Sequence, residues 1–296
     1  MATVRVGLVG AGPWARAVHA PALAAHPGTT LAGVWARRQA AAGEIATEFG
    51  GKPYERVDDL IADVDVLAFA VPPAVQAELA VRAAGQARHL ICEKPLAETA
   101  GAAREVVAAV SAAGVVSAVM LTLRHDPLIE EWLATLPGGE AGPDTHGLAR
   151  WLSGSLLGGR YADSPWRHEH GALLDVGPHV VDLMDAALGR VTRVDWAHRD
   201  EPDLWRFGLV HADGARTTVT ISMRMPIMPS EIEFGVFGGA GRHRLATRPA
   251  DPVACYGRLL DGVVAAVQGT GPVPVLDAAR ALHLQEVLEQ VRRAAS

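Results

Sequence analysis

The chain has 296 residues, a formal net charge of −6 and a composition that is 49% hydrophobic and 20% charged, which is typical of a globular protein with one large or two ordinary domains. No block of like charges occurs, so nucleic acid and anionic membranes are poor partners, because both require a concentrated basic surface. No apolar run is long enough to span a bilayer, so we expect a soluble protein.

The cysteines and the first residues indicate a cytoplasmic protein. Cys92 and Cys255 are the only cysteines, and two residues so far apart in the sequence do not make a disulfide framework. The first apolar run contains Arg5 and leads directly into a glycine-rich loop, which is typical of a first strand and not of a signal peptide. We therefore expect the reducing environment of the cytoplasm.

The first part of the chain alternates short apolar runs with alanine-rich helical stretches. Strands are expected at residues 4–9, 30–35, 64–71, 89–92 and 115–121. Helices are expected at residues 14–26, 39–49, 73–84 and 99–113. This alternation predicts βαβ units and a parallel sheet, whose strands are apolar throughout because both faces of the sheet are covered.

The rhythm changes after about residue 122. One long helix is expected at 172–188, and two more are expected at 252–268 and 276–294. Between them, strand-like runs separated by turn signals occur at 191–198, 204–211, 215–223, 231–237 and 242–247. We predict an α/β protein with a Rossmann-type, doubly wound parallel sheet in residues 1–121. Residues 122–296 are predicted to form an α+β domain with an open, mostly antiparallel sheet, and the last helices could pack back on the first domain.

A glycine loop follows the first predicted strand. Gly10, Gly12 and Ala15 form the pattern G-x-G-x-x-A between a strand and a helix. Gly10 permits the tight turn, and Gly12 lets the backbone approach a pyrophosphate, which the N–H groups and dipole of the helix N-terminus attract. The loop predicts a dinucleotide site to which Pro13 and Trp14 also contribute.

The residues after the second predicted strand favour NADP over NAD. An NAD site usually offers an acidic residue there for the ribose 2′-hydroxyl, but no acidic residue occurs from Thr29 to Gly43. Arg37 and Arg38 stand there instead, and arginine binds phosphate in a bidentate manner. The alternative is that both arginines are solvated residues at the start of a helix.

Lys94 directly follows the predicted strand at 89–92, and ligands bind at the carboxyl ends of the strands in an open parallel sheet. Of the 27 basic residues only Lys52 and Lys94 are lysines, so a lysine at this place is less expected by chance. Lysine can transfer a proton, whereas arginine cannot take that role. The alternative is a surface lysine before the turn-forming Pro95.

Five short segments carry a further signal through their order and spacing: Gly10-Ala11-Gly12, His19–Leu23, Val71-Pro72-Pro73, Glu93-Lys94-Pro95 and Gly171–His179. In these segments the chain resembles the Gfo/Idh/MocA family, named for glucose–fructose oxidoreductase, inositol dehydrogenase and a rhizopine catabolism protein. The resemblance implies an NAD(P)-dependent oxidoreductase that transfers hydride between nicotinamide and a hydroxyl- or oxo-bearing carbon of a sugar, sugar derivative or cyclitol. It also implies cofactor contacts from Val71, Pro72, Glu93 and Lys94. The family often has a histidine where Gln76 stands, which puts one cofactor-side contact in doubt.

Asp175 and His179 lie four residues apart in a helical pattern, so their side chains share one face. A carboxylate beside an imidazole can fix its tautomer and raise its basicity. The resemblance implies that this is the acid/base pair, in which Lys94 and His179 manage the proton on the substrate oxygen and Asp175 orients His179. The alternative is a solvated or structural pair. Pro178 removes one helical hydrogen bond, so we expect a kink next to His179.

The segment 168–170, His-Glu-His, could ligate zinc, but no fourth ligand at a fitting interval is evident. We expect no metal and interpret the segment as a loop that lines the substrate pocket. The residues expected to face substrate are Arg124, Trp166, Arg167 and His168. The alternatives are a buried tryptophan and solvated arginines.

Two other functions stay open, namely reduction of an imine-type, non-sugar substrate and a non-catalytic NADP-binding sensor or regulator, because Rossmann folds also serve in regulators. The presence of Lys94, Asp175 and His179 favours an enzyme. The resemblance also implies pairing through the open sheet. We therefore expect a homodimer or homotetramer, and alternating apolar residues on the outer face of 204–223 would support it.

Overall fold

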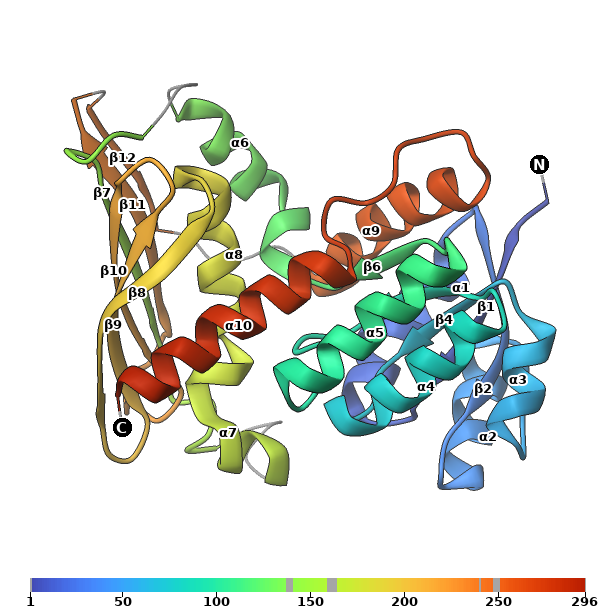
Figure 1. The fold of residues 1–296 in the computed structure, drawn as a ribbon. Coiled ribbons are helices and arrows are strands. Elements are labelled where there is room, and N and C mark those ends of the chain that lie inside the picture. Colours follow the sequence, from blue (N-terminus) through green and yellow to red (C-terminus); the bar gives the residue numbers. More distant parts are fainter. Residues whose placement is uncertain (1, 137–140, 159–163, 240, 247–250, 296) are drawn as a thin grey trace. The chain divides into compact units, whose positions relative to one another are not determined.

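The structure is a computed structural model and describes residues 2–136, 141–158, 164–239, 241–246 and 251–295. The chain divides into two compact units, residues 1–125 with 251–282 and residues 126–250 with 283–296. The first unit contains a parallel sheet, and the second contains a mixed, mostly antiparallel sheet (Figure 1). The predicted fold class is confirmed.

The sheet of the first unit has the strand order β3-β2-β1-β4-β5-β6 among the described residues. Its strands are β1 (Val4–Val9), β2 (Thr29–Trp35), β3 (Lys52–Pro53), β4 (Val66–Phe69), β5 (His89–Cys92) and β6 (Ser117–Val119). The order reverses between β1 and β4, and ligands bind outside the carboxyl ends of the strands at such a switch point. The sequence did not predict β3, because this two-residue strand is exposed and has no apolar run.

Helices cover both faces of this parallel sheet (Figure 1). They are η1 (Ala15–His19, a π-helix), α1 (Ala20–Ala25), α2 (Gln39–Phe49), α3 (Val57–Asp63), α4 (Pro73–Gly85), α5 (Ala100–Ala113), η2 (Thr122–His125) and α9 (Pro252–Val267). Helices α4 and α5 pack on each other, and α1 contacts α2 and α9. The strands between the helical layers are strongly apolar, and every residue of β4 is buried.

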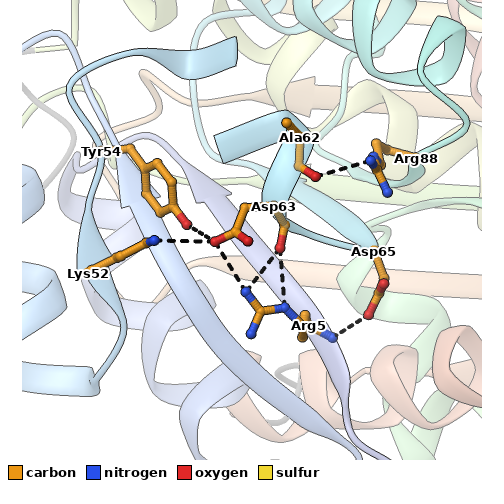
Figure 2. A network of polar contacts seen from close by, with 7 residues as sticks. All are labelled: Arg5, Lys52, Tyr54, Ala62, Asp63, Asp65 and Arg88. Carbon is orange, nitrogen blue, oxygen red and sulfur yellow. Dashed lines mark hydrogen bonds and ion pairs between the residues drawn. The ribbon is translucent and has the colours of Figure 1, made fainter. Parts of the chain in front are cut away.

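A polar network ties the start of β1 to β3 and to the turn between α3 and β4 (Figure 2). The guanidinium of Arg5 donates to the backbone oxygen of Asp63 and lies 3.2 Å from its carboxylate, while the amide of Arg5 donates to Asp65 at 2.9 Å. Lys52 lies 3.3 Å from the same Asp63 carboxylate, which also accepts from the hydroxyl of Tyr54. The network aligns these segments. Because its charged groups are exposed, it adds little net stability. Lys52, one of the two lysines, is therefore explained by a structural contact.

The sheet of the second unit has the order β12-β11-β7-β10-β9-β8, in which β7 and β10 are parallel and the other described pairs are antiparallel. Its strands are β7 (His146–Leu152), β8 (Val191–Asp200), β9 (Leu204–His211), β10 (Arg216–Ser222), β11 (Glu231–Gly238) and β12 (Gly241–Leu245). Strand β7 was missed, because arginine and half-buried residues interrupt its apolar pattern. The predicted end of the last strand, Thr247, lies outside the described residues.

The outer face of 204–223 does not carry the alternating apolar residues that would support pairing through this sheet. Phe207 pairs with Val219 across β9 and β10, and both side chains are buried. The opposite face carries Arg206 and Thr220, which pair with each other, and Thr218. The alternation is present, but its apolar side faces the helices, because a sheet with only one covered face turns its hydrophobic residues inward.

The helices of the second unit are α6 (Pro127–Thr135), α7 (Pro165–Asp175), α8 (Gly177–Leu188) and residues 283–294 of α10 (Ala278–Ala294). The single helix predicted at 172–188 is wrong, because the helix is interrupted at Val176. The kink expected next to His179 is replaced by this break, since Pro178 stands in the first turn of α8, where its missing N–H costs no helical hydrogen bond. The segment interpreted as a loop at 168–170 is helical. The Ser164 side chain accepts from the Arg167 amide and Pro165 stands at the first turn, so the Ser-Pro pair begins a helix instead of marking a turn.

No helix formed by the described residues has both the length and the apolar character needed to cross a membrane.

His211 at the end of β9 is a buried histidine with both ring nitrogens bonded. Its Nδ1–H donates to the backbone oxygen of Gly189 at 2.6 Å, and its Nε2 lies 2.8 Å from the hydroxyl of Thr217. Burial lowers the pKa of His211 below its ordinary value of 6.5, although the bond to Gly189 and the charges of Asp185 and Asp213 oppose this shift. The folded state therefore binds a proton on this ring less readily than the unfolded state does.

This predicts a loss of stability as the pH falls. Because the folded pKa is depressed, the contribution of neutral His211 is complete above the unfolded pKa of about 6.5 and decreases below it. The free energy of unfolding, measured with urea between pH 7.5 and pH 5, should fall less steeply in His211→Gln than in the wild type, by at most about 1.4 kcal/mol per pH unit. The same substitution at the exposed His198 serves as control, and equal slopes in wild type and His211→Gln would contradict the prediction.

Candidate functional site

The glycine loop joins the carboxyl end of β1 to η1. Gly10 has φ +118, and a Cβ there would lie 2.3 Å from the backbone oxygen of Ala70, so the protein's own backbone requires glycine. A Cβ on Gly12 would meet nothing within 4 Å. Gly12 therefore leaves open space over the backbone at the start of η1, which is what close approach of a pyrophosphate requires. The predicted Pro13 is exposed and Trp14 is half-buried at the same helix start.

The carboxylate of Glu93 connects this loop to the turn that carries Lys94. Trp14 donates its indole N–H to Glu93 Oε1 at 2.7 Å, and Nε2 of the fully buried His19 lies 2.9 Å from the same oxygen. The ring of Tyr256 in α9 packs 4.5 Å from the His19 ring, centroid to centroid. The structure thus brings together Trp14 and Glu93, which the sequence predicted as separate contacts, and adds His19 and Tyr256.

A second residue, Gln76 of α4, holds the backbone of the same turn. Its amide nitrogen donates to the backbone oxygens of Glu93 at 2.8 Å, Leu96 at 2.9 Å and Pro95 at 3.3 Å. Its amide oxygen accepts from the Glu93 N–H at 2.8 Å, and the side chain is fully buried. Gln76, expected only to remove a cofactor contact, therefore positions the turn on which the half-buried Lys94 stands.

Two other reactive groups beside this turn are inert. Burial, reinforced by the charge of Glu93, raises the pKa of the Cys92 thiol to about 12. Burial also raises the pKa of Tyr256 well above its ordinary value, with Glu93 and Cys92 adding to the effect. Both groups stay protonated near neutral pH, so neither supplies a nucleophile or a base there.

Arg37 and Arg38 follow β2 and are both exposed. Arg38 directly precedes α2, which begins without a side-chain cap and has no acidic residue in its first turn. Neither arginine forms an ion pair with any residue that the structure describes. The start of α2 therefore presents two cations beside the positive end of a helix dipole.

Two further cofactor residues and one substrate residue of the sequence prediction lie elsewhere in the first unit. Val71 is half-buried and Pro72 is exposed, directly before α4 and beside the position that a Cβ on Gly10 would take. Arg124 is half-buried in η2, at the end of the first unit's main segment.

In the second unit, Asp175 and His179 flank the break between α7 and α8. Both are buried, with 7% and 8% of their surfaces exposed. Asp175 accepts from Nε of Arg167 at 2.8 Å, which is one of the predicted substrate residues. The His179 ring stacks on Trp151 of β7, with the centroids 6.1 Å apart and the planes 28° apart. Trp151 was missed because β7 was not predicted.

Asp203 fixes the backbone around this pair. Its carboxylate accepts from the amide of Ala172 at 2.9 and 3.2 Å and from the amide of Met223 at 3.0 Å. Gly171 has φ +57, and a Cβ there would lie 2.2 Å from Asp203 Oδ1, so glycine is required at this point of α7. Burial raises the pKa of Asp203, although both amides oppose the shift. Asp203 lies near a Glu-Pro turn in the sequence and gave no local signal of this role.

The remaining predicted substrate residues lie in α7. Trp166 makes an edge-on contact with His170, with the ring centroids 5.1 Å apart. His168 is exposed, and its Nδ1 lies 2.6 Å from Nη2 of Arg224. Among the described residues, no group of three or more His, Cys, Asp or Glu side chains could hold a metal ion. Arg224 was not predicted, because only the fold places it beside α7.

The chain is similar to known oxidoreductases in its first part and to related proteins over most of its length. Residues 4–121 match the model of the family described as oxidoreductases with an NAD-binding Rossmann fold. The human glucose-fructose oxidoreductase domain-containing protein 2 is 30% identical over 269 residues, which cover 83% of this chain and 68% of that protein. Glucose-6-phosphate 3-dehydrogenase of Bacillus subtilis (strain 168) is 29% identical over 186 residues, 61% of this chain and 52% of that enzyme. The alignment therefore spans about half the length of the Bacillus enzyme.

The fold is also found in solved structures. The structure of GenD2 from gentamicin A biosynthesis, in complex with NAD, superposes with a TM-score of 0.87 at 24% sequence identity. The superposition covers 100% of this chain and 95% of that one.

The geometry of Gln76 predicts a large effect of its removal. Gln76→Leu would leave the half-buried N–H of Glu93 and the buried carbonyl groups of Pro95 and Leu96 without this partner, each costing about 1–3 kcal/mol. We expect the free energy of unfolding in urea to fall by about 3 kcal/mol or more. Gln39→Leu is the matched control, because the Gln39 amide also donates to two backbone oxygens but is exposed. A Gln76→Leu variant as stable as the control would contradict this role.

Proposed function

The chain belongs to the Gfo/Idh/MocA family of oxidoreductases with an NAD-binding Rossmann fold, and we propose that it is an NADP-preferring enzyme acting on CH–OH groups. It transfers hydride between the nicotinamide and a hydroxyl- or oxo-bearing carbon of a sugar, a sugar derivative or a cyclitol. The name of the Bacillus subtilis relative, a glucose-6-phosphate 3-dehydrogenase, supports this substrate class.

The observation that carries the proposal is the joint construction of the glycine loop and the Lys94 turn. The open backbone at Gly12 fits a pyrophosphate. Trp14 of the same loop donates to the carboxylate of Glu93, which is the residue before Lys94. A bound dinucleotide would supply the hydride acceptor or donor, and the protein supplies its placement. Gly10, Gly12, Pro13, Trp14, Val71, Pro72 and Glu93 are proposed to hold it.

The start of α2 supports the preference for NADP. Acidic residues usually stabilise the N-terminus of a helix and cations destabilise it, yet this helix begins after Arg37 and Arg38 with no acidic residue in its first turn. A 2′-phosphate bound there would neutralise both arginines and accept bidentate hydrogen bonds from them.

Lys94, Asp175 and His179 are the proposed catalytic residues. Lys94 and His179 hold and move the proton at the substrate oxygen, and Asp175 orients His179. The stack on Trp151 limits the freedom of the His179 ring, and Arg167 holds the Asp175 carboxylate. Arg124, Trp166, Arg167 and His168 are proposed to contact the substrate.

The two parts of the chain have different roles in this proposal. Residues 1–121 bind the cofactor, and residues 122–296 bind substrate and form the contacts of a homodimer or homotetramer. The support for such pairing is Trp196 of β8, which is 45% exposed and lies over Gly208 of β9, on the face of the sheet opposite to the buried Phe207. Neither cysteine forms a disulfide and both are buried, which fits the cytoplasm that we propose as its location.

Removing both arginines tests the cofactor preference. NADPH should bind the wild type more tightly than NADH does, and Arg37→Gln with Arg38→Gln should weaken NADPH about 10- to 100-fold while leaving NADH unchanged. Cofactor fluorescence titrations measure both. Arg56→Gln, an exposed arginine before α3, is the control. Equal affinity of the wild type for the two cofactors would contradict the preference.

Removing the proton-handling groups tests the activity. In a screen of polyols and oxo-sugars with the preferred cofactor, Lys94→Ala and His179→Ala should each lower kcat about 10²- to 10⁴-fold without weakening cofactor binding. Lys52→Ala removes the other lysine and should leave kcat unchanged. Near-wild-type turnover in both variants would sink the assignment, and tight NADPH binding without turnover of any compound would favour a sensor.

A further inference from the structure

Arg224 lies two residues beyond the end of β10 and is half-buried. Its Nη2 donates to Nδ1 of His168 at 2.6 Å, because a guanidinium can only donate and the ring nitrogen must accept. The ring hydrogen of His168 is then on Nε2. This bond orients the guanidinium of Arg224, whose other N–H groups are also donors.

Arg224 differs from most other arginines of the second unit in its ion pairs. Most of its arginines have carboxylate partners, as in the pairs Arg150–Glu231, Arg167–Asp175, Arg206–Asp200, Arg216–Asp195 and Arg244–Glu233. Arg224 forms no ion pair with any described residue. Glu169, which follows His168 in α7, is exposed and forms no described ion pair with Arg224. Asp203 lies near enough to sense the charge of Arg224, but its oxygens already accept backbone amides.

The hydrogen bonds of Asp203 also place Arg224 near the proposed acid/base pair. Asp203 bonds the amide of Met223, the residue before Arg224, and the amide of Ala172, three residues before Asp175. On the sheet, Trp151 pairs with Ile221 of β10 and stacks on His179. The end of β10, the α7 helix and the acid/base pair therefore converge within one unit.

From this placement we propose that Arg224, oriented by His168, forms a subsite for an anionic substituent of the substrate, a phosphate or a carboxylate. The inference rests on the proposed function and adds to it that the sugar or cyclitol is acidic. A guanidinium has only donors and so favours groups that only accept, and a half-buried arginine without a carboxylate gains most from an anion. Neutral hydroxyl groups would leave the charge of Arg224 unbalanced.

The test uses the enzyme saturated with NADP⁺ and matched probes: D-glucose with D-glucose 6-phosphate and with D-glucuronate, and myo-inositol with myo-inositol 1-phosphate. Binding is measured by calorimetry and turnover by cofactor reduction. In at least one pair the wild type should bind the anionic member about 10- to 100-fold more tightly than the neutral member. Preference for the phosphate esters or for the uronate identifies which anion is recognised.

Variants at the subsite separate its role from folding. Arg224→Gln should abolish the preference and leave the neutral member unchanged, Arg224→Lys should retain part of it, and His168→Ala should reduce it. Arg206→Gln, which removes an exposed arginine on β9, is the control and should change nothing. The subsite is refuted if no anionic probe binds better than its neutral partner, or if Arg224→Gln weakens both members equally. Loss of turnover on every probe with the binding preference intact would refute the proposed function alone.

Discussion

The backbone of residues 93–96 depends on one buried amide, that of Gln76. This turn leaves the strand ladder after β5, so its N–H and carbonyl groups have no partners in the sheet, and buried groups without partners are costly. Gln76 supplies a donor and an acceptor from α4 and bonds the N–H of Glu93 and carbonyl groups of the turn. The position of Lys94 follows from that contact, because its two neighbours in the chain are held by it.

A side-chain carboxylate joins distant segments in a similar way in each unit. Glu93 receives Trp14 and His19 and so fixes the Lys94 turn against the glycine loop. Asp203 receives two backbone amides and fixes α7 against the end of β10. In each case a buried polar group joins segments that are distant in sequence, and its full set of hydrogen bonds specifies one arrangement of the backbone. The rigid supports on which the proposed chemistry stands are therefore polar, although the layers around them are apolar.

Among the described residues, some arginines have carboxylate partners and others have none. The arginines on the outer face of the second sheet are neutralised by neighbouring strands, and they explain why the apolar alternation of 204–223 points inward. Arg37, Arg38 and Arg224 lack such partners among the described residues, and they lie at a helix N-terminus and beside α7. Composition alone could not separate the two groups, because pairing depends on strand register.

The sequence by itself determined the parallel sheet of the first unit, the glycine turn after β1 and the place of Lys94 directly after β5. These features follow from local rules, namely apolar runs, turn residues and helical spacing, which act within a few residues. Only the tertiary structure decided the strand β7 and the roles of Gln76, Asp203, Trp151 and Arg224. The partners of these four side chains stand 17 to 56 residues away, as in the pairs Gln76–Glu93 and Arg224–His168. A hydrogen bond over such a separation leaves no periodic trace in the sequence, because it depends on how the elements pack.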